Sequence, residues 1–266
     1  MSDEMRVCLL AEESMAAWQR TALRRAVEET NATVECVIVN RSPGRTRAEQ
    51  LRRAVELREW TAVTALLALE RRVAGDIPES ESYALDEIPL LDEAERIECV
   101  PTVVDGWKYE LPQDVVAKAA RSADVGVLFG FGFITGPILN AFDNGILSFH
   151  HGDLREYRGQ PMGFWEYLND EDEAGVTLQR LTETLDGGEI ICLDRIDISD
   201  QRRWKGVKSR LLAASEDTLA EGIRRIQDDS FTPQKPATTG DLYTIPRGKP
   251  VAQFVGKTLS RSLVGR

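Results

Sequence analysis

The chain has only two histidines, His150 and His151, and they are adjacent. They follow the apolar run 146–149 (ILSF), which predicts a β-strand, and they lead into a loop that begins with glycine. A separate segment carries Asp186 directly before two glycines. An imidazole and a carboxylate that converge from separate strands are the minimum equipment for proton-managed acyl transfer. The alternative is structural: His150 would end a strand, and Asp186 would form a turn.

Composition limits what the rest of the chain can be. Its 266 residues, 42% of them hydrophobic, suffice for one large domain with a substantial core. The sequence holds no apolar run of the roughly 18 residues that span a bilayer, and its start does not resemble a signal peptide. Its four scattered cysteines are best read as buried free thiols rather than as disulfides or metal ligands. These features predict a cytoplasmic protein without a metal or a membrane span.

Charge is unevenly distributed. The net charge is −11, but residues 201–266 hold 13 Lys and Arg against 6 Asp and Glu. The acidic remainder repels nucleic acid, so a nucleic-acid partner is not expected. The basic end either holds a nucleotide diphosphate or docks on the acidic body or on a second subunit, as in a homodimer.

The opening of the chain predicts a strand over 5–11, a helix over 15–29 capped by Ser14, and a β-branched strand over 34–39. A strand–helix–strand unit of this length favours a parallel sheet covered by helices. We therefore expect an α/β, Rossmann-like fold with a mostly parallel central sheet, helices on both faces and an antiparallel strand pair at one end. Residues 1–200 would form the catalytic domain and residues 201–266 a short C-terminal extension. Further predicted elements are helices over 46–73, 111–121, 163–169 and 208–227, strands over 97–104, 125–129, 144–149, 176–181 and 189–196 (the last two antiparallel), an irregular proline-rich stretch from 231, and an amphipathic tail over 251–266.

Four short motifs occur in a fixed order after residue 147. They are Ser148-Phe149-His150, Tyr157-Arg158-Gly159, Gly175-Val176-Thr177 and Leu185-Asp186-Gly187-Gly188. Their order, and the nine residues from His150 to Gly159, resemble the formyltransferase family. That family includes the methionyl-tRNA, glycinamide-ribonucleotide and nucleotide-sugar N-formyltransferases, which use 10-formyltetrahydrofolate. The first 120 residues match it only as a βαβ opening.

The resemblance implies that His150 and Asp186 form the catalytic pair. Formyl transfer passes through a tetrahedral intermediate, which needs donors aimed at its oxyanion and a group that accepts the proton of the amine. His150 would stabilise the oxyanion, and Asp186 would orient the imidazole and assist proton removal. The family's carboxamide, an Asn two positions before the His, is replaced here by Ser148. Loss of one such donor can cost about 10²–10³ in rate.

Other residues receive roles from the same resemblance. The loop of Gly130, Phe131, Gly132, Phe133 and Ile134 would line the slot for the pteridine ring, although it could equally be a bare tight turn. Its glycine spacing superficially resembles a dinucleotide motif, but the loop does not follow the first strand and lacks the acidic ribose partner.

The resemblance also suggests roles in the site for residues 151–153 and for Arg158 and Gly159. His151 and Gly152-Asp153 are candidates to replace the missing donor, and Asp153 would otherwise anchor a cationic acceptor or lie on the surface. Arg158 and Gly159 would hold the loop shut over the site, with a structural salt bridge as the alternative for Arg158.

The leading hypothesis is an N-formyltransferase that moves a formyl group from 10-formyltetrahydrofolate to a primary amine of a small acceptor, with nucleotide sugars and phosphorylated amines as candidate classes. One alternative is hydrolysis of the same donor, with water in place of the amine. Another is a folate-binding regulatory protein with weakened catalysis, which the loss of the Asn at position 148 makes worth testing.

Overall fold

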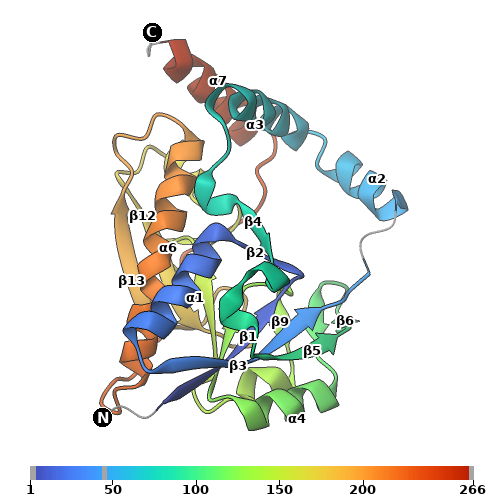
Figure 1. The fold of residues 1–266 in the computed structure, drawn as a ribbon. Coiled ribbons are helices and arrows are strands. Elements are labelled where there is room, and N and C mark those ends of the chain that lie inside the picture. The colour runs from blue at the N-terminus through green and yellow to red at the C-terminus, as the bar shows by residue number, and fades with distance from the viewer. Residues whose placement is uncertain (1–3, 44–46, 264–266) are drawn as a thin grey trace.

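The computed structural model describes residues 4–43 and 47–263. At its centre lies a seven-stranded sheet (Figure 1) in the order β13 (Glu189–Asp197), β12 (Glu173–Arg180), β10 (Ile146–His150), β8 (Val125–Leu128), β1 (Met5–Ala11), β3 (Ala32–Asn40) and β5 (Glu95–Cys99). The five strands from β10 to β5 run parallel, whereas β12 pairs antiparallel with both β10 and β13. The predicted α/β class and its antiparallel end pair are confirmed.

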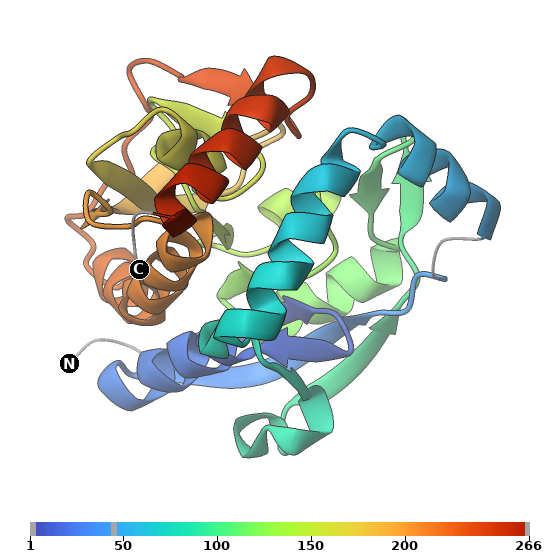
Figure 2. The ribbon, with the colours of Figure 1, turned by 90° about the horizontal axis from the view of Figure 1, so that it is seen from above.

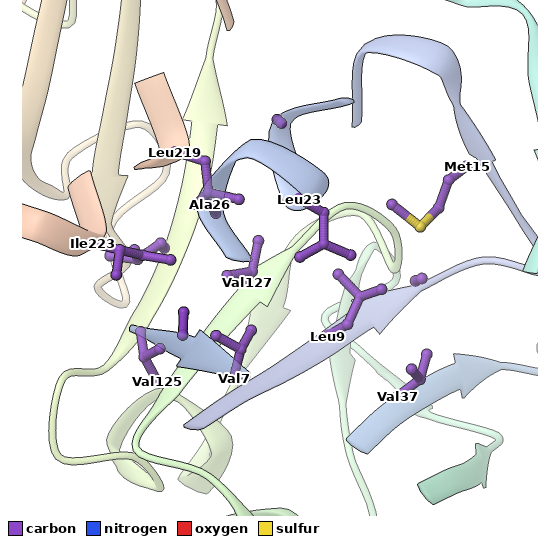
Figure 3. Packing of buried hydrophobic residues seen from close by; sticks show 14 of the residues in the cluster. Val7, Leu9, Met15, Leu23, Ala26, Val37, Val125, Val127, Leu219 and Ile223 are labelled. Carbon is purple, nitrogen blue, oxygen red and sulfur yellow. The ribbon is translucent and has the colours of Figure 1, made fainter. Parts of the chain in front are cut away.

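Helices cover both faces of the sheet, which is why its central strands are almost continuously apolar. On one face, α1 (Ala17–Glu29) and α6 (Trp204–Ile226) bury the side chains that Figure 3 shows packed over β1, β3 and β8. On the other face, α4 (Gln113–Ser122) packs Val115 and Ala119 against Leu10 and Ile38. All four cysteines are buried free thiols, as expected.

The segment between β3 and β5 leaves the sheet. It forms α2 (Arg47–Glu56) and α3 (Trp60–Ala74), and α3 packs beside α7 (Lys249–Leu263) away from the sheet (Figures 1 and 2). The single helix predicted over 46–73 is therefore wrong. Its apolar period continues across 57–59, but the backbone turns there through Arg58 N–H to the Val55 carbonyl and Trp60 N–H to the Leu57 carbonyl.

Ser14 is not a helix cap. It lies in β2 (Ser14–Ala16), which pairs with β4 (Ser82–Ala84), and the Gln19 side chain instead accepts the Ala16 N–H at 2.8 Å at the start of α1. The strand predicted over 97–104 is also divided. β5 ends at Cys99, and β6 (Thr102–Val104) joins a second small sheet with β7 (Lys108–Glu110) and β9 (Ile134–Thr135).

The acidic stretch near residues 76–96 is held to the body by buried Leu85, Ile88 and Leu91. Short 3-10 helices punctuate it and the loop after β9: η1 (Pro78–Ser80), η2 (Leu85–Glu87), η3 (Pro89–Leu91) and η4 (Pro137–Asn140).

The C-terminal region contains a strand that the sequence did not predict. β14 (Asp241–Tyr243) pairs in parallel with β11 (Tyr157–Gly159). β11 is followed along the chain by the short helix α5 (Phe164–Leu168). Basic side chains of the region pair with acids of the body, as Arg224 does with Glu29 and Lys257 and Arg261 do with Asp170. These pairs favour docking on the acidic body, while the domain boundary at residue 200 stays a prediction. Within the described residues, no helix is both long enough and apolar enough to cross a bilayer.

Candidate active site

A cavity of about 1630 Å³ opens beside the face of β10 and β12 that carries Ser148, His150 and Gln179. The loop 181–188 between β12 and β13 folds back along this face and brings Asp186 to the cavity. Glu183 fastens that loop, because its carboxylate accepts the Thr135 hydroxyl at 2.7 Å. The remaining walls come from residues 132–134, the segment 100–109, β14 and the charged face of α2.

His150 and Asp186 face each other in this cavity. The Nδ1 atom of His150 lies 3.6 Å from Oδ1 of Asp186. The other ring nitrogen, Nε2, is 2.8 Å from the carbonyl oxygen of Tyr157, to which it can only donate. The proton on Nε2 is thereby fixed, and Nδ1 is the nitrogen that can hold or release a proton on the side of Asp186.

Asp186 is oriented by a backbone amide. The Gly159 N–H donates to its Oδ2 at 2.9 Å, which leaves Oδ1 toward the imidazole. Gly159 has a φ of 94°, and a Cβ there would lie 1.9 Å from the carbonyl oxygen of Tyr243. Only glycine fits this position, and its N–H positions the acid. The role predicted for Gly159, holding the loop shut over the site, stays a prediction.

His151 lines the cavity, but its ring is engaged elsewhere. It packs against Trp18 and Phe149, and its Nε2 lies 3.0 Å from the hydroxyl of Ser215. The Ser215 hydroxyl donates its hydrogen bond to the Leu211 carbonyl. In the contact between His151 and Ser215, His151 Nε2 must therefore be the donor. Burial, with a smaller effect of His150, lowers the pKa of His151 to about 3. His151 is therefore neutral at physiological pH, and its Nε2 is not available as a replacement donor.

The predicted pteridine loop divides into two parts. Gly132, Phe133 and Ile134 line the cavity, but Gly130 and Phe131 do not. A Cβ at Gly130 would meet the backbone of Glu12 at 2.6 Å, and the Phe131 ring is buried in the core on the α4 side. Only the second half of the loop therefore lies where it could contact a ligand in this cavity, and binding of the pteridine stays a prediction.

Trp107 was missed by the sequence analysis. Its half-exposed ring packs against Phe133 with centroids 4.9 Å apart, and both rings line the cavity. The only available signal was a tryptophan in a polar turn, which gave no indication of its partner.

Asp153 and Arg158 lie outside the cavity wall. The Asp153 carboxylate is buried, which opposes its ionisation, but ion pairs with Arg155 at 2.7 Å and Arg195 at 3.0 Å hold its pKa below the usual value. It is therefore held in structural ion pairs outside this cavity, and a role in anchoring the acceptor stays a prediction. Arg158 donates from Nε to the Gly240 carbonyl at 2.7 Å and so ties the C-terminal segment to β11, and it forms no salt bridge with residues 4–43 or 47–263.

Glu166 is a second residue that was missed. Its side chain is 3% exposed, and its Oε1 has no hydrogen-bond partner within the described part of the chain. It borders a small void that His150, His151 and Tyr157 also line. Burial, reinforced by Glu171 and Glu156, raises the pKa of Glu166 to about 7. The sequence indicated only an aromatic helix there.

The sheet order, the antiparallel edge and the His–Asp pair beside a large cavity define a protein of the formyltransferase fold. Glycinamide ribonucleotide transformylase 1 from Symbiobacterium toebii superposes with a TM-score of 0.54 at 18% identity, over 88% of this chain and 95% of its own. An N-formyltransferase from Helicobacter canadensis, solved with folinic acid and dTDP-3-aminofucose, superposes with a TM-score of 0.57 at 13% identity, over 97% and 82%. At these identities the likeness concerns the fold.

The chain matches the formyl transferase family model over residues 107–223, which are less than half of its length. Methionyl-tRNA formyltransferases are among its sequence relatives. The protein from Anaeromyxobacter dehalogenans strain 2CP-1 is 28% identical over 181 residues, which cover 65% of this chain and 57% of the relative. The one from Chlorobium chlorochromatii is 29% identical over 143 residues, covering 50% and 46%. The chain thus spans about half the length of the curated relatives that it matches.

Proposed function

We propose that this protein transfers a formyl group from 10-formyltetrahydrofolate to a primary amine of a small acceptor. The observation that carries the proposal is the pairing of His150 Nδ1 with Asp186 Oδ1 across 3.6 Å, beside a cavity of about 1630 Å³. The match of residues 107–223 to the formyl transferase family model supports the reaction type.

The two side chains divide the chemistry. A new bond forms between the acceptor nitrogen and the formyl carbon, and the bond from that carbon to N10 of the folate then breaks. His150, with a proton on Nδ1, donates to the oxygen that becomes negative in the tetrahedral intermediate. Asp186 receives the proton that the acceptor amine loses, and this proton is returned to N10 as the bond breaks. Atoms and charge therefore balance without a metal or an oxidant.

The walls of the cavity suit two kinds of ligand. Trp107 and Phe133 offer aromatic faces to a flat heterocycle such as a pteridine. A relative's structure with folinic acid supports this donor class. The opposite wall carries Glu49, Arg52 and Glu56 of α2. Two acids and one base suit a protonated amine better than a polyanionic nucleic acid.

Purified protein mixed with 10-formyltetrahydrofolate is expected to release tetrahydrofolate only when a suitable amine is present, at a rate on the order of 1–10 per second with a good acceptor. A panel of amino sugars, nucleotide-linked amino sugars and amino acids identifies the acceptor, and mass spectrometry detects the formamide. Reactions without protein and reactions with 5-formyltetrahydrofolate serve as controls.

Each other outcome contradicts the proposal in its own way. Equal release with and without amine means that water is the acceptor and that the protein is a hydrolase. Tight binding of the folate with no release under any condition means that the protein is a folate-binding regulator.

A further inference from the structure

In the family that the sequence resembles, an asparagine at the position of Ser148 donates a hydrogen bond to the reacting formyl oxygen. The side chain of Ser148 is too short to reach the same oxygen. Its hydroxyl is shorter than the carboxamide of an asparagine. His151 donates its Nε2 proton to Ser215, and Asp153 is held by two arginines away from the cavity. Neither residue can replace the missing carboxamide, so a different side chain must be sought on the same wall.

Gln179 occupies the required place. In the antiparallel pair of β10 and β12, Ser148 lies directly opposite Gln179, and His150 lies opposite Thr177. Directly opposed residues have Cβ atoms about 5 Å apart and project from the same face of a sheet. Gln179, Ser148, His150 and Asp186 all line the cavity. The side chain of Gln179 is 3% exposed, so it is enclosed by the site rather than solvated at its rim.

The orientation of the Gln179 amide is fixed by a second contact. Its Oε1 accepts the Gly188 N–H at 3.1 Å. The Nε2 group is therefore the other end of the amide, and the one side-chain hydrogen bond of Gln179 seen among the described residues is that of Oε1 with Gly188. A Cβ at Gly188 would lie 2.5 Å from Oε1, so the glycine after Gly187 provides the space that this orientation needs.

We propose that Gln179 Nε2 donates a hydrogen bond to the formyl oxygen and shares the developing negative charge with His150. The inference rests on the proposed formyl transfer and adds a catalytic residue to it. The carboxamide that the family carries at the position of Ser148 on β10 is thus supplied here by Gln179, which lies opposite on β12. A small residue at 148 leaves room for the longer glutamine to extend across the strand pair.

The test uses two variants that remove the donor. Gln179→Glu keeps an oxygen for the Gly188 N–H but has no N–H of its own, and Gln179→Met removes both polar atoms at similar size. Both variants are expected to lower kcat about 100-fold. The KM for 10-formyltetrahydrofolate should change less than about threefold, because the Trp107 and Phe133 rings that line the cavity are unchanged. Gln201→Met is the matched control, since the Gln201 amide bonds Asp200 outside the cavity. Binding of 5-formyltetrahydrofolate and thermal melting show whether each variant folds.

Rescue at position 148 makes the test specific. Adding Ser148→Asn to Gln179→Met is expected to restore kcat at least tenfold, because it returns a carboxamide to the same oxygen. In the wild type, Ser148→Asn is expected to give no increase, because that place is already filled. Full kcat in a folded Gln179→Met variant would overturn the inference. A tenfold increase from Ser148→Asn alone would also overturn it, even if the Gln179 variants do not fold. If the wild-type protein shows no transfer with any acceptor, the proposed function fails instead.

Discussion

His150→Ala is expected to lower kcat/KM for formyl transfer by about 10²–10³, because the variant loses the donor aimed at the oxyanion. Asp186→Asn is expected to act on kcat to a similar degree, about 10²-fold or more. Its carboxamide oxygen can still accept the Gly159 N–H, but the side chain can no longer take a proton from the amine. Steady-state kinetics with the acceptor identified from the panel measures both effects.

Binding of 5-formyltetrahydrofolate separates chemistry from folding in these variants. Both are expected to bind it within a few-fold of the wild type, since the aromatic wall at Trp107 and Phe133 is untouched. A His150→Ala variant with full turnover would remove the mechanism proposed here, whatever its affinity for folate.

Glu166→Gln is expected to stabilise the folded protein at high pH. An unfolded Glu ionises near pH 4.5, whereas burial raises the pKa of Glu166 to about 7 in the folded state. Between these values the folded state binds the proton that the unfolded state has lost, so the wild type loses stability as the pH rises through this window. The shift corresponds to about 3 kcal/mol above pH 7. Glutamine resembles the protonated acid in shape and does not ionise, so the variant does not lose this folding free energy as the pH rises.

Urea unfolding between pH 4 and pH 8.5 measures this effect. The free energies of unfolding of the wild type and of Glu166→Gln should nearly coincide at pH 4 and diverge by about 3 kcal/mol at pH 8.5. Glu28→Gln, on the exposed side of α1, is the control and should follow the wild type within about 0.5 kcal/mol at every pH. Parallel pH curves for wild type and Glu166→Gln would show that Glu166 ionises normally in the folded protein.

The sheet was predictable because the strands buried on both faces are apolar runs in the sequence, as in 5–11 and 125–129. The turn at 57–59 was not predictable, because residues on both sides of it keep the helical spacing. β14 was hidden for a different reason. Its partner β11 lies more than 80 residues earlier, and a three-residue strand among prolines has no local pattern.

The site shows the same division. The motifs around His150 and Asp186 indicated that the two side chains meet, and the structure brings them together, while their catalytic roles remain predictions. Gln179 and Glu166 gave no comparable signal. The first depends on the register between two antiparallel strands, and the second on a void beneath the histidines, and neither can be read from spacing along the chain.

The pairing of β14 with β11 has a consequence for any shortened or chimeric form of the protein. The amide that orients Asp186 belongs to Gly159, and the backbone of Tyr243 packs directly on that glycine. Cutting the chain near residue 230 would keep every proposed catalytic side chain. It would also remove β14, the strand that pairs with β11 at Gly159, whose N–H orients Asp186. Exchanging C-terminal segments between relatives is therefore expected to change reaction rates as well as ligand preference, because β14 supports the glycine that aligns the proposed proton acceptor.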